Sequence, residues 1–266
     1  MLTSRQELQA RWSGEEARIE KILSALKTGA DWTAFLGAFE ANGVAYGPLP
    51  LLDILQTDGR DLRGFPLENV DLSGIQLDGV DLEFAVFFKV TLNEAIISSQ
   101  KKVSNLAGAS FVHCRFEHAQ FESANCKNVH FGHCNLSNAN FSGATLDGAS
   151  LRASNLDGAN FVRAALRDVD FIHSELRNVS VSAETALGVI SPAGSSPLRI
   201  RLEDQAVTMN FDRFQFANQG EAFQEAAKVY AQFADAWNSC GFVETGNLWR
   251  SKAKECLLLA SGHRHG

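Results

Sequence analysis

A large apolar residue stands at every fifth position over almost half of this chain. The pattern has a first run of 8 members and a second run of 16, which makes 24 units. The first run is Leu62, Leu67, Leu72, Leu77, Leu82, Phe87, Leu92 and Ile97. The second run is Leu106, Phe111, Phe116, Phe121, Cys126, Phe131, Leu136, Phe141, Leu146, Leu151, Leu156, Phe161, Leu166, Phe171, Leu176 and Val181. A helix repeats its apolar residues about every 3.6 positions and a strand every second, so a period of five excludes both as long continuous elements.

A second set of smaller apolar residues lies two positions before the first. It comprises Val70, Ile75, Val80, Ala85, Val90, Ala109, Cys114, Ala119, Ala124, Val129, Cys134, Ala139, Ala144, Ala149, Ala159, Ala164, Val169 and Val179. The residue between the two sets is usually Asp or Asn, and pairs such as Asp147-Gly148 often follow. Two inward residues spaced by two indicate a short extended piece, and the polar residues after them favour a turn. Each unit is therefore expected to form one side of a coil, with stability coming from coils stacked on one another.

The runs NVDLSGIQLDGVDL and NLSNANFSGATLDGASL resemble the A(D/N)Lxx motif of the pentapeptide-repeat family, and the resemblance covers residues 61–181. It implies a mainly β fold, a right-handed quadrilateral β-helix with four units per coil. Six coils would make a rod about 29 Å long at the usual strand spacing. Residues 20 apart would then stack, and two such columns are Phe111, Phe131, Leu151, Phe171 and Phe121, Phe141, Phe161, Val181. Stacked Phe side chains would fill the interior and leave no lumen for a ligand.

The repeat is interrupted once, because nine residues separate Ile97 from Leu106 where five are expected. The four extra residues predict a small bulging loop that carries Lys101 and Lys102. Two interpretations stay open, a tolerated surface insertion or a loop that contacts a partner.

The flanks of the repeat are predicted to be helical. Residues 1–58 carry apolar residues at helical spacing, among them Leu8, Trp12 and Ile22, followed by Trp32, Phe35, Leu36 and Phe39. Two or three short helices there are expected to cap the N-terminal edge of the rod, which would otherwise expose unpaired backbone groups. Residues 183–218, which include SPAGSSPL, are interpreted as a linker with a possible short strand at Arg199–Leu202.

Residues 219–262 predict a helical hairpin that breaks at Gly241. The hairpin resembles a single tetratricopeptide unit at Tyr230, Phe233, Ala234, Trp237, Gly246 and Ala253, whereas Arg250 stands where the motif has an aromatic residue. A lone unit cannot form the usual peptide groove, so a C-terminal cap or docking module is expected.

Composition argues against several functional classes. The net charge of −7 gives no general attraction to phosphate backbones or to anionic lipid. The start of the chain has no apolar core of a secretory signal, and no stretch approaches 18 continuous apolar residues. Five Cys without a CxxC pair, with Cys114, Cys126 and Cys134 at inward positions, favour reduced core thiols over a chelating trio. We therefore expect a bacterial cytoplasmic protein.

The sequence contains no recognisable motif of catalytic residues. One outward position of the repeat is shared by His113, His118, His133 and His173. Two imidazoles stacked at this position could hold a metal ion or could be solvated, and we favour solvated side chains. No glycine-rich phosphate loop is present. The sequence thus predicts no enzyme, cofactor or metal, and an enzyme would need a polar cleft where the rod meets a flank.

Two outward patches are candidates for a partner surface. The first is acidic and comprises Asp61, Glu68, Asp71, Asp78, Asp81 and Glu83 in the first coils. The second is apolar and comprises Phe84, Val86 and Phe88 at positions that are normally polar. An exposed apolar patch marks a contact, and here that contact is either a partner or a flanking helix of the same chain.

The resulting functional hypothesis is a protein-interaction scaffold that binds another protein and does not bind nucleic acid or membrane directly. The pentapeptide-repeat family includes DNA mimics that bind type II topoisomerases and protect them from quinolones, and an acidic rod would suit that alternative. However, residues 61–181 carry 14 acids and 10 bases, a net charge of only −4, and long flanks surround the repeat. The chain is expected to be a monomer, or a homodimer through one flank.

Overall fold

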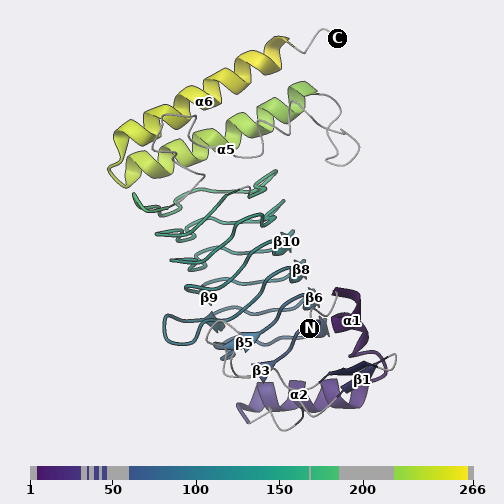
Figure 1. Cartoon of the computed structure of the whole chain (residues 1–266). Coiled ribbons are helices and arrows are strands. Elements are labelled where there is room, and N and C mark those ends of the chain that lie inside the picture. Colours follow the sequence, from purple (N-terminus) through teal and green to yellow (C-terminus); the bar gives the residue numbers. More distant parts are fainter. Residues whose placement is uncertain are drawn as a thin grey trace.

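The chain forms a rod with helices at both ends (Figure 1). The computed structural model describes residues 5–30, 35, 39–41, 44–46, 60–167, 169–185 and 219–262. Helices α1 (Arg5–Ala10) and α2 (Glu16–Thr28) lie at one end, and helices α5 (Gln219–Ser239) and α6 (Val243–Gly262) lie at the other. Between them the repeat region winds as a β-solenoid, which confirms the fold expected from the five-residue period.

Parallel pairing between residues one coil apart builds the solenoid. The longest sheet has the order β10-β8-β6-β4. Its strands are β4 (Pro66–Glu68), β6 (Val86–Phe88), β8 (Ser110–Val112) and β10 (His130–Gly132). Two smaller parallel pairs join β3 (Arg60–Asp61) to β5 (Val80–Asp81), and β7 (Ile96–Ser98) to β9 (Gln120–Phe121). One column of bridges runs through residues 61, 81, 105, 125, 145 and 165, which marks the six expected coils of a right-handed β-helix.

The interior is a solid stack of aromatic and aliphatic side chains. Phe111 and Phe131 stack with ring centroids 5.0 Å apart, and Phe121 stacks on Phe141 at 4.7 Å. Phe161 continues the second column at 5.5 Å from Phe141. These rings are essentially inaccessible to solvent, so both predicted columns are confirmed.

The sides of the coil end at residues with a left-handed backbone conformation, and this conformation explains which residue types recur at that position. The residue two positions after a core residue has a positive φ in nearly all the described units, as at Gly74 (72°), His133 (54°) and Asn138 (56°). Gly adopts this conformation without strain, and Asn and His adopt it more readily than most residues. The shared position of the histidines is therefore a backbone requirement of the coil.

Two of the inward cysteines satisfy backbone carbonyls at one corner of the coil. The Cys114 thiol donates to the Phe87 carbonyl at 3.5 Å, and the Cys134 thiol donates to the Phe111 carbonyl at 3.3 Å. Ser154 fills the same role one coil further, where its hydroxyl donates to the Phe131 carbonyl at 3.0 Å. These cysteines, like Cys126, are free and buried, as expected.

The N-terminal helices pack on the first coil. The Trp12 indole donates to the Arg63 carbonyl at 2.8 Å, and its ring meets the edge of Phe65 at 4.6 Å. Helix α1 passes so close to Gly64 that a Cβ there would lie 2.2 Å from the Leu8 carbonyl oxygen.

The N-terminal flank is not purely helical, which corrects the expectation for residues 1–58. Strands β1 (Phe39–Ala41) and β2 (Val44–Tyr46) form an antiparallel hairpin, so Phe39 lies on a strand and not on a helical face. Asn42-Gly43 separates the two strands in the sequence, and this pair is the usual signal of a two-residue hairpin. Trp32, Leu36 and the end of this flank at 47–59 lie outside the described residues.

The C-terminal hairpin covers the last coil in two layers (Figure 1). Phe233 of α5 contacts Phe171 of the core at 5.2 Å, and the Gln232 side chain accepts the Leu176 amide at 2.6 Å. Helix α6 packs on the far side of α5, where Trp249 meets Tyr230 and Phe233 at 5.4 and 5.6 Å. The linker from 186 to 218, with its predicted strand at Arg199–Leu202, lies outside the described residues. No helix in the described parts of the chain is long and apolar enough to cross a membrane.

Candidate interaction surfaces

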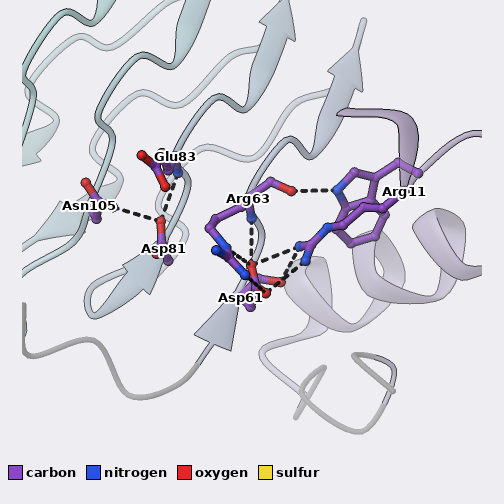
Figure 2. A network of polar contacts seen from close by, with 7 residues as sticks. Arg11, Asp61, Arg63, Asp81, Glu83 and Asn105 are labelled. Atoms are coloured by element: carbon purple, nitrogen blue, oxygen red, sulfur yellow. Dashed lines mark hydrogen bonds and ion pairs between the residues drawn. The ribbon is translucent and has the colours of Figure 1, made fainter. Parts of the chain in front are cut away.

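Asp61, which the sequence places in an acidic patch, is a buried ion-pair partner (Figure 2). The Arg11 guanidinium donates to both carboxylate oxygens, at 2.8 and 2.9 Å, and Arg63 does so at 3.0 Å to each. Asp61 is only 3% exposed and Arg11 only 1%. Burial alone would raise the pKa of Asp61, but hydrogen bonds from Arg63 and Arg11 outweigh it and lower that pKa. Asp61 therefore fastens α1 to the first coil and is not available to a partner.

Asp81 lies one coil above Asp61 and is buried without an arginine of its own (Figure 2). Its carboxylate accepts the Glu83 amide at 3.0 Å and the Asn105 side-chain amide at 3.1 Å. Burial raises the pKa of Asp81 to about 7. Burial also raises the pKa of the half-buried Glu83. Asp81 is therefore enclosed within the stacked coils and does not project as an acidic group toward a partner.

The other three acidic candidates point in different directions. Glu68 and Asp71 are both exposed. Glu68 follows the core residue of one unit and Asp71 precedes the core residue of the next unit, so the two carboxylates lie on adjacent faces of the rod. Hydrogen bonds from Ser73 lower the pKa of Asp71. Asp78 is half-buried and accepts the Ser99 hydroxyl at 3.2 Å. The six carboxylates thus do not form one continuous acidic surface.

The apolar patch divides into an intramolecular part and an accessible part. Phe84 packs its ring against Gly108 of the next coil, where a Cβ would lie 2.4 Å from the ring, and its carbonyl accepts the Gln9 side chain of α1 at 3.1 Å. Val86 and Phe88 lie on β6, half-buried, with outward side chains on the four-stranded sheet. The Phe88 ring meets His113 at 5.8 Å and lies 4.9 Å from the Lys89 ammonium.

The four-residue insertion forms a loop that two serines close. The Ser104 amide donates to the Ser98 hydroxyl at 3.1 Å, and the Ser104 hydroxyl donates to the Leu77 carbonyl at 3.1 Å. Both serines are buried, so the solenoid continues beneath the loop. Lys101 and Lys102 are exposed at its tip.

The histidines gather on one side of the rod. His113 stacks on His133 with ring centroids 5.1 Å apart, as the 20-residue spacing predicts. His173 lies further along the same column and pairs with Glu225 of α5 at 3.4 Å. The sequence pattern missed His130, which precedes a core residue and holds its ring over Gly132, with Nε2 only 2.7 Å from where a Cβ would be. In the described parts of the chain, no three potential ligands are grouped to hold a metal ion.

One cavity lies where α2 meets the first coil and has a volume of about 670 Å³. Lys27, Arg60, Asp71, Ser73 and Gln76 provide polar groups to its wall. Among the described residues of the wall there is no His or Cys and one carboxylate, Asp71, whose lowered pKa does not suit a general acid or base near neutral pH.

Comparison with known proteins agrees with this geometry. A family model described as a pentapeptide repeat region matches residues 124–185, and a second, for pentapeptide repeats in eight copies, matches residues 104–138. No curated protein matches the chain. The coils from 61 to 103 lie outside both matches, but they pair in the same register as the rest.

Several solved structures are similar to part of the chain. HetL, a pentapeptide repeat protein involved in heterocyst differentiation regulation in Nostoc sp. strain PCC 7120, is 24% identical over 47% of this chain and 63% of its own length, with a TM-score of 0.36. Rfr23 of Cyanothece 51142 is 20% identical over 47% of this chain and 86% of its own, with a TM-score of 0.30. QnrB1, a plasmid-mediated fluoroquinolone resistance protein, is 20% identical over 50% of this chain and 89% of its own, with a TM-score of 0.18. The match thus spans less than two thirds of HetL.

The fold and the repeat pattern define a class of non-globular repeat protein, a quadrilateral β-solenoid closed by helices. Within that class, residues 104–185 of this chain match the pentapeptide-repeat family.

Proposed function

We propose that the protein is a non-enzymatic scaffold that binds another protein through the outward side chains of its solenoid. The observation that carries this proposal is the solid core. Stacked rings fill the interior of the coils, so the described solenoid presents its chemistry only on flat outer faces. Flat, rigid faces with fixed side-chain spacing suit recognition of a macromolecule, since a small ligand needs concave surroundings.

The proposal includes a cellular location and an assembly state. Five free cysteines in the described residues support a reducing compartment, and we place the protein in the bacterial cytoplasm. Helices at both ends of the rod block end-to-end stacking of solenoids, which supports a monomer, or a homodimer through the helices themselves.

A defined complex is the test of the scaffold function. The full chain, tagged and immobilised, should capture one protein from its native host in a saturable way. The purified pair should elute together with a fixed mass ratio in size-exclusion chromatography with light scattering. If no captured protein forms such a complex, the scaffold proposal is wrong.

The alternative, a DNA mimic that binds DNA gyrase, predicts a different result. It requires projecting carboxylates, and the exposed Glu68 and Asp71 provide them on two faces, while Asp61 and Asp81 are buried. A gyrase supercoiling assay with and without a quinolone tests it. Protection of gyrase by micromolar protein supports the mimic, and no effect removes it.

A further inference from the structure

One face of the rod differs in chemistry from the others. It is the sheet β4-β6-β8-β10 with the residues that continue its columns, and it carries four of the five histidines in the described residues. We call its accessible centre the histidine face and define it by six residues, Phe88, Lys89, His113, His130, His133 and Arg152. The following face instead carries the carboxylates Glu94, Glu117, Asp157 and Glu175 at outward positions, together with Arg115 and Arg177.

The side chains of the histidine face form a continuous, flat row. Phe88 meets His113, and His113 stacks on His133. The imidazole of His130 covers Gly132, so the row has no gap at that glycine. Parallel strands in unbroken register fix the spacing of these groups, because β6, β8 and β10 pair residue for residue.

Groups of different chemistry limit the histidine face at both ends. At the C-terminal end, Ile172 is buried and His173 pairs with Glu225 of α5. At the N-terminal end, the column continues to Glu68, whose side chain accepts the Asn69 amide at 2.9 Å. The accessible part is therefore limited to the middle coils.

We propose that the histidine face docks an acidic segment of a partner protein and binds it more tightly as the pH falls from 8 toward 5.5. This inference rests on the scaffold function proposed above and specifies its surface and partner chemistry. Lys89 and Arg152 supply permanent positive charge, and imidazoles gain charge over this pH range. Phe88, Val86 and the imidazole rings provide flat apolar area beside those charges, which suits apolar residues that accompany the partner's carboxylates.

The charged groups around the histidines set the range in which the face responds. Burial lowers the pKa of His130, the charges of His133, Arg5 and Arg152 act in the same direction, and Asp170 opposes them. Burial raises the pKa of Asp170, and the charges of Arg152, His173 and His130 oppose that shift. Around His173, Glu225 is shared with Lys228 of α5, so His173 is excluded from the docking set. His113 and His133 face each other and Phe88, with Lys89 beside that ring.

The first experiment uses a defined acidic probe. Fluorescein-labelled poly-L-glutamate of about 20 residues is titrated with the full chain at about pH 8 and about pH 5.5, in low salt, and anisotropy is measured. An isolated glutamate side chain stays mostly ionised at both values. Repulsion between neighbouring carboxylates raises their pKa values and so removes charge from the probe at the lower pH, which opposes the expected increase in affinity and cannot produce it. We expect binding about tenfold tighter at the lower pH, because the exposed imidazoles of His113 and His133 each add a charge contact of modest strength.

Matched variants decide whether the histidine face is responsible. The double substitution His113→Asn and His133→Asn keeps a residue that tolerates the left-handed conformation, as Asn128 and Asn138 do at equivalent positions. It should reduce the pH effect to about threefold or less without changing the melting temperature. The control is His118→Asn, which alters the same repeat position on the neighbouring carboxylate-bearing face and should leave the pH effect intact.

Three outcomes would overturn the proposal. These are an equal loss in the His118→Asn control, no pH dependence in the wild-type chain, and equally tight, equally pH-dependent binding of a DNA duplex of similar charge. A captured protein partner separates this proposal from the scaffold function. If the partner binds the His113→Asn, His133→Asn variant as tightly as the wild type, the histidine face is the wrong surface and the scaffold function stands. If no partner exists, the scaffold function fails, while the glutamate titration still decides the chemistry of the face.

Discussion

Replacing Asp81 by Asn should stabilise the protein at alkaline pH and leave it nearly unchanged at acidic pH. Asp81 is 1% exposed and accepts hydrogen bonds from the Glu83 amide and the Asn105 side chain. Its one-coil neighbour Asp61 already receives both arginines. An Asn keeps the acceptor oxygen and removes the charge, and Asn105 and Asn125 show that stacked amides fit this column, with a hydrogen bond of 2.8 Å between them.

The size of the effect follows from the pKa of Asp81. In the unfolded chain the carboxyl titrates near 3.8, and in the folded chain its pKa is raised to about 7. The folded state therefore binds the proton more tightly, so this stabilising contribution is full below about pH 3.8 and is lost as the pH rises through 7. A shift of about three pKa units corresponds to about 4 kcal/mol. Because partial solvation and relaxation reduce such effects, we expect a gain of about 2–4 kcal/mol for Asp81→Asn at pH 8.

The assay is urea unfolding from pH 4 to pH 8, followed by circular dichroism. Hydrogen exchange of amides in the first two coils gives a local measurement, which is needed because repeat proteins can unfold in parts. Asp71→Asn is the matched control, since Asp71 holds the same repeat position but is exposed, and its pKa is lowered by Ser73. If Asp81→Asn destabilises the chain at pH 8, or its pH profile parallels the wild type, the argument from burial is wrong.

Three further substitutions test the cap and the core, each by urea unfolding. Arg11→Met removes one partner of the buried Asp61 pair and should cost about 3 kcal/mol or more, whereas Arg177→Met, in an exposed pair with Glu175, should cost under about 1 kcal/mol; equal costs would refute the role of Arg11. Gly64→Ala should release α1, since its Cβ would meet the Leu8 carbonyl at 2.2 Å, and altered Trp12 fluorescence with an intact solenoid circular dichroism signal is the expected observation. Phe131→Ala should cost about 3–5 kcal/mol because it opens a cavity in the central column, and a cost below about 1 kcal/mol would mean that the column is not tightly packed.

The five-residue period was enough to predict the solenoid and its core. Because four units complete one coil, the period also fixes which residues of successive coils lie on top of one another. Once four units complete a coil, Phe111 must lie beneath Phe131, and the structure places the rings 5.0 Å apart. The same logic placed His113 against His133. Cys114 and Cys134 were likewise predictable as inward residues, although the period does not reveal that their thiols replace serine hydroxyls as donors to core carbonyls.

The acidic patch was harder to predict because its exposure depends on a contact outside the repeat. Asp61 holds a position that is partly exposed in later coils, such as at Asn125 and Asn135. It is buried because Arg11, 50 residues away in sequence, lies over it. For Phe84 the sequence left a partner contact and an intramolecular contact open, and the structure shows the intramolecular one, since the ring packs against Gly108 and the carbonyl accepts the Gln9 side chain of α1. His130 escaped notice because it precedes a core residue, unlike the other histidines.

These contacts indicate at which positions of the solenoid the side chains can differ so as to bind a partner. Core positions are fixed by stacking, and the left-handed positions are restricted to residues that tolerate a positive φ. Among the outward positions, Asp61 and Gly64 in the first coil are covered by α1, and His173 in the last coil is paired with Glu225 of α5. The outward positions of the middle coils are the ones whose side chains can change without loss of the cap or the core. The histidine face lies there, so a partner that recognises this rod is expected to contact its middle coils and not its ends.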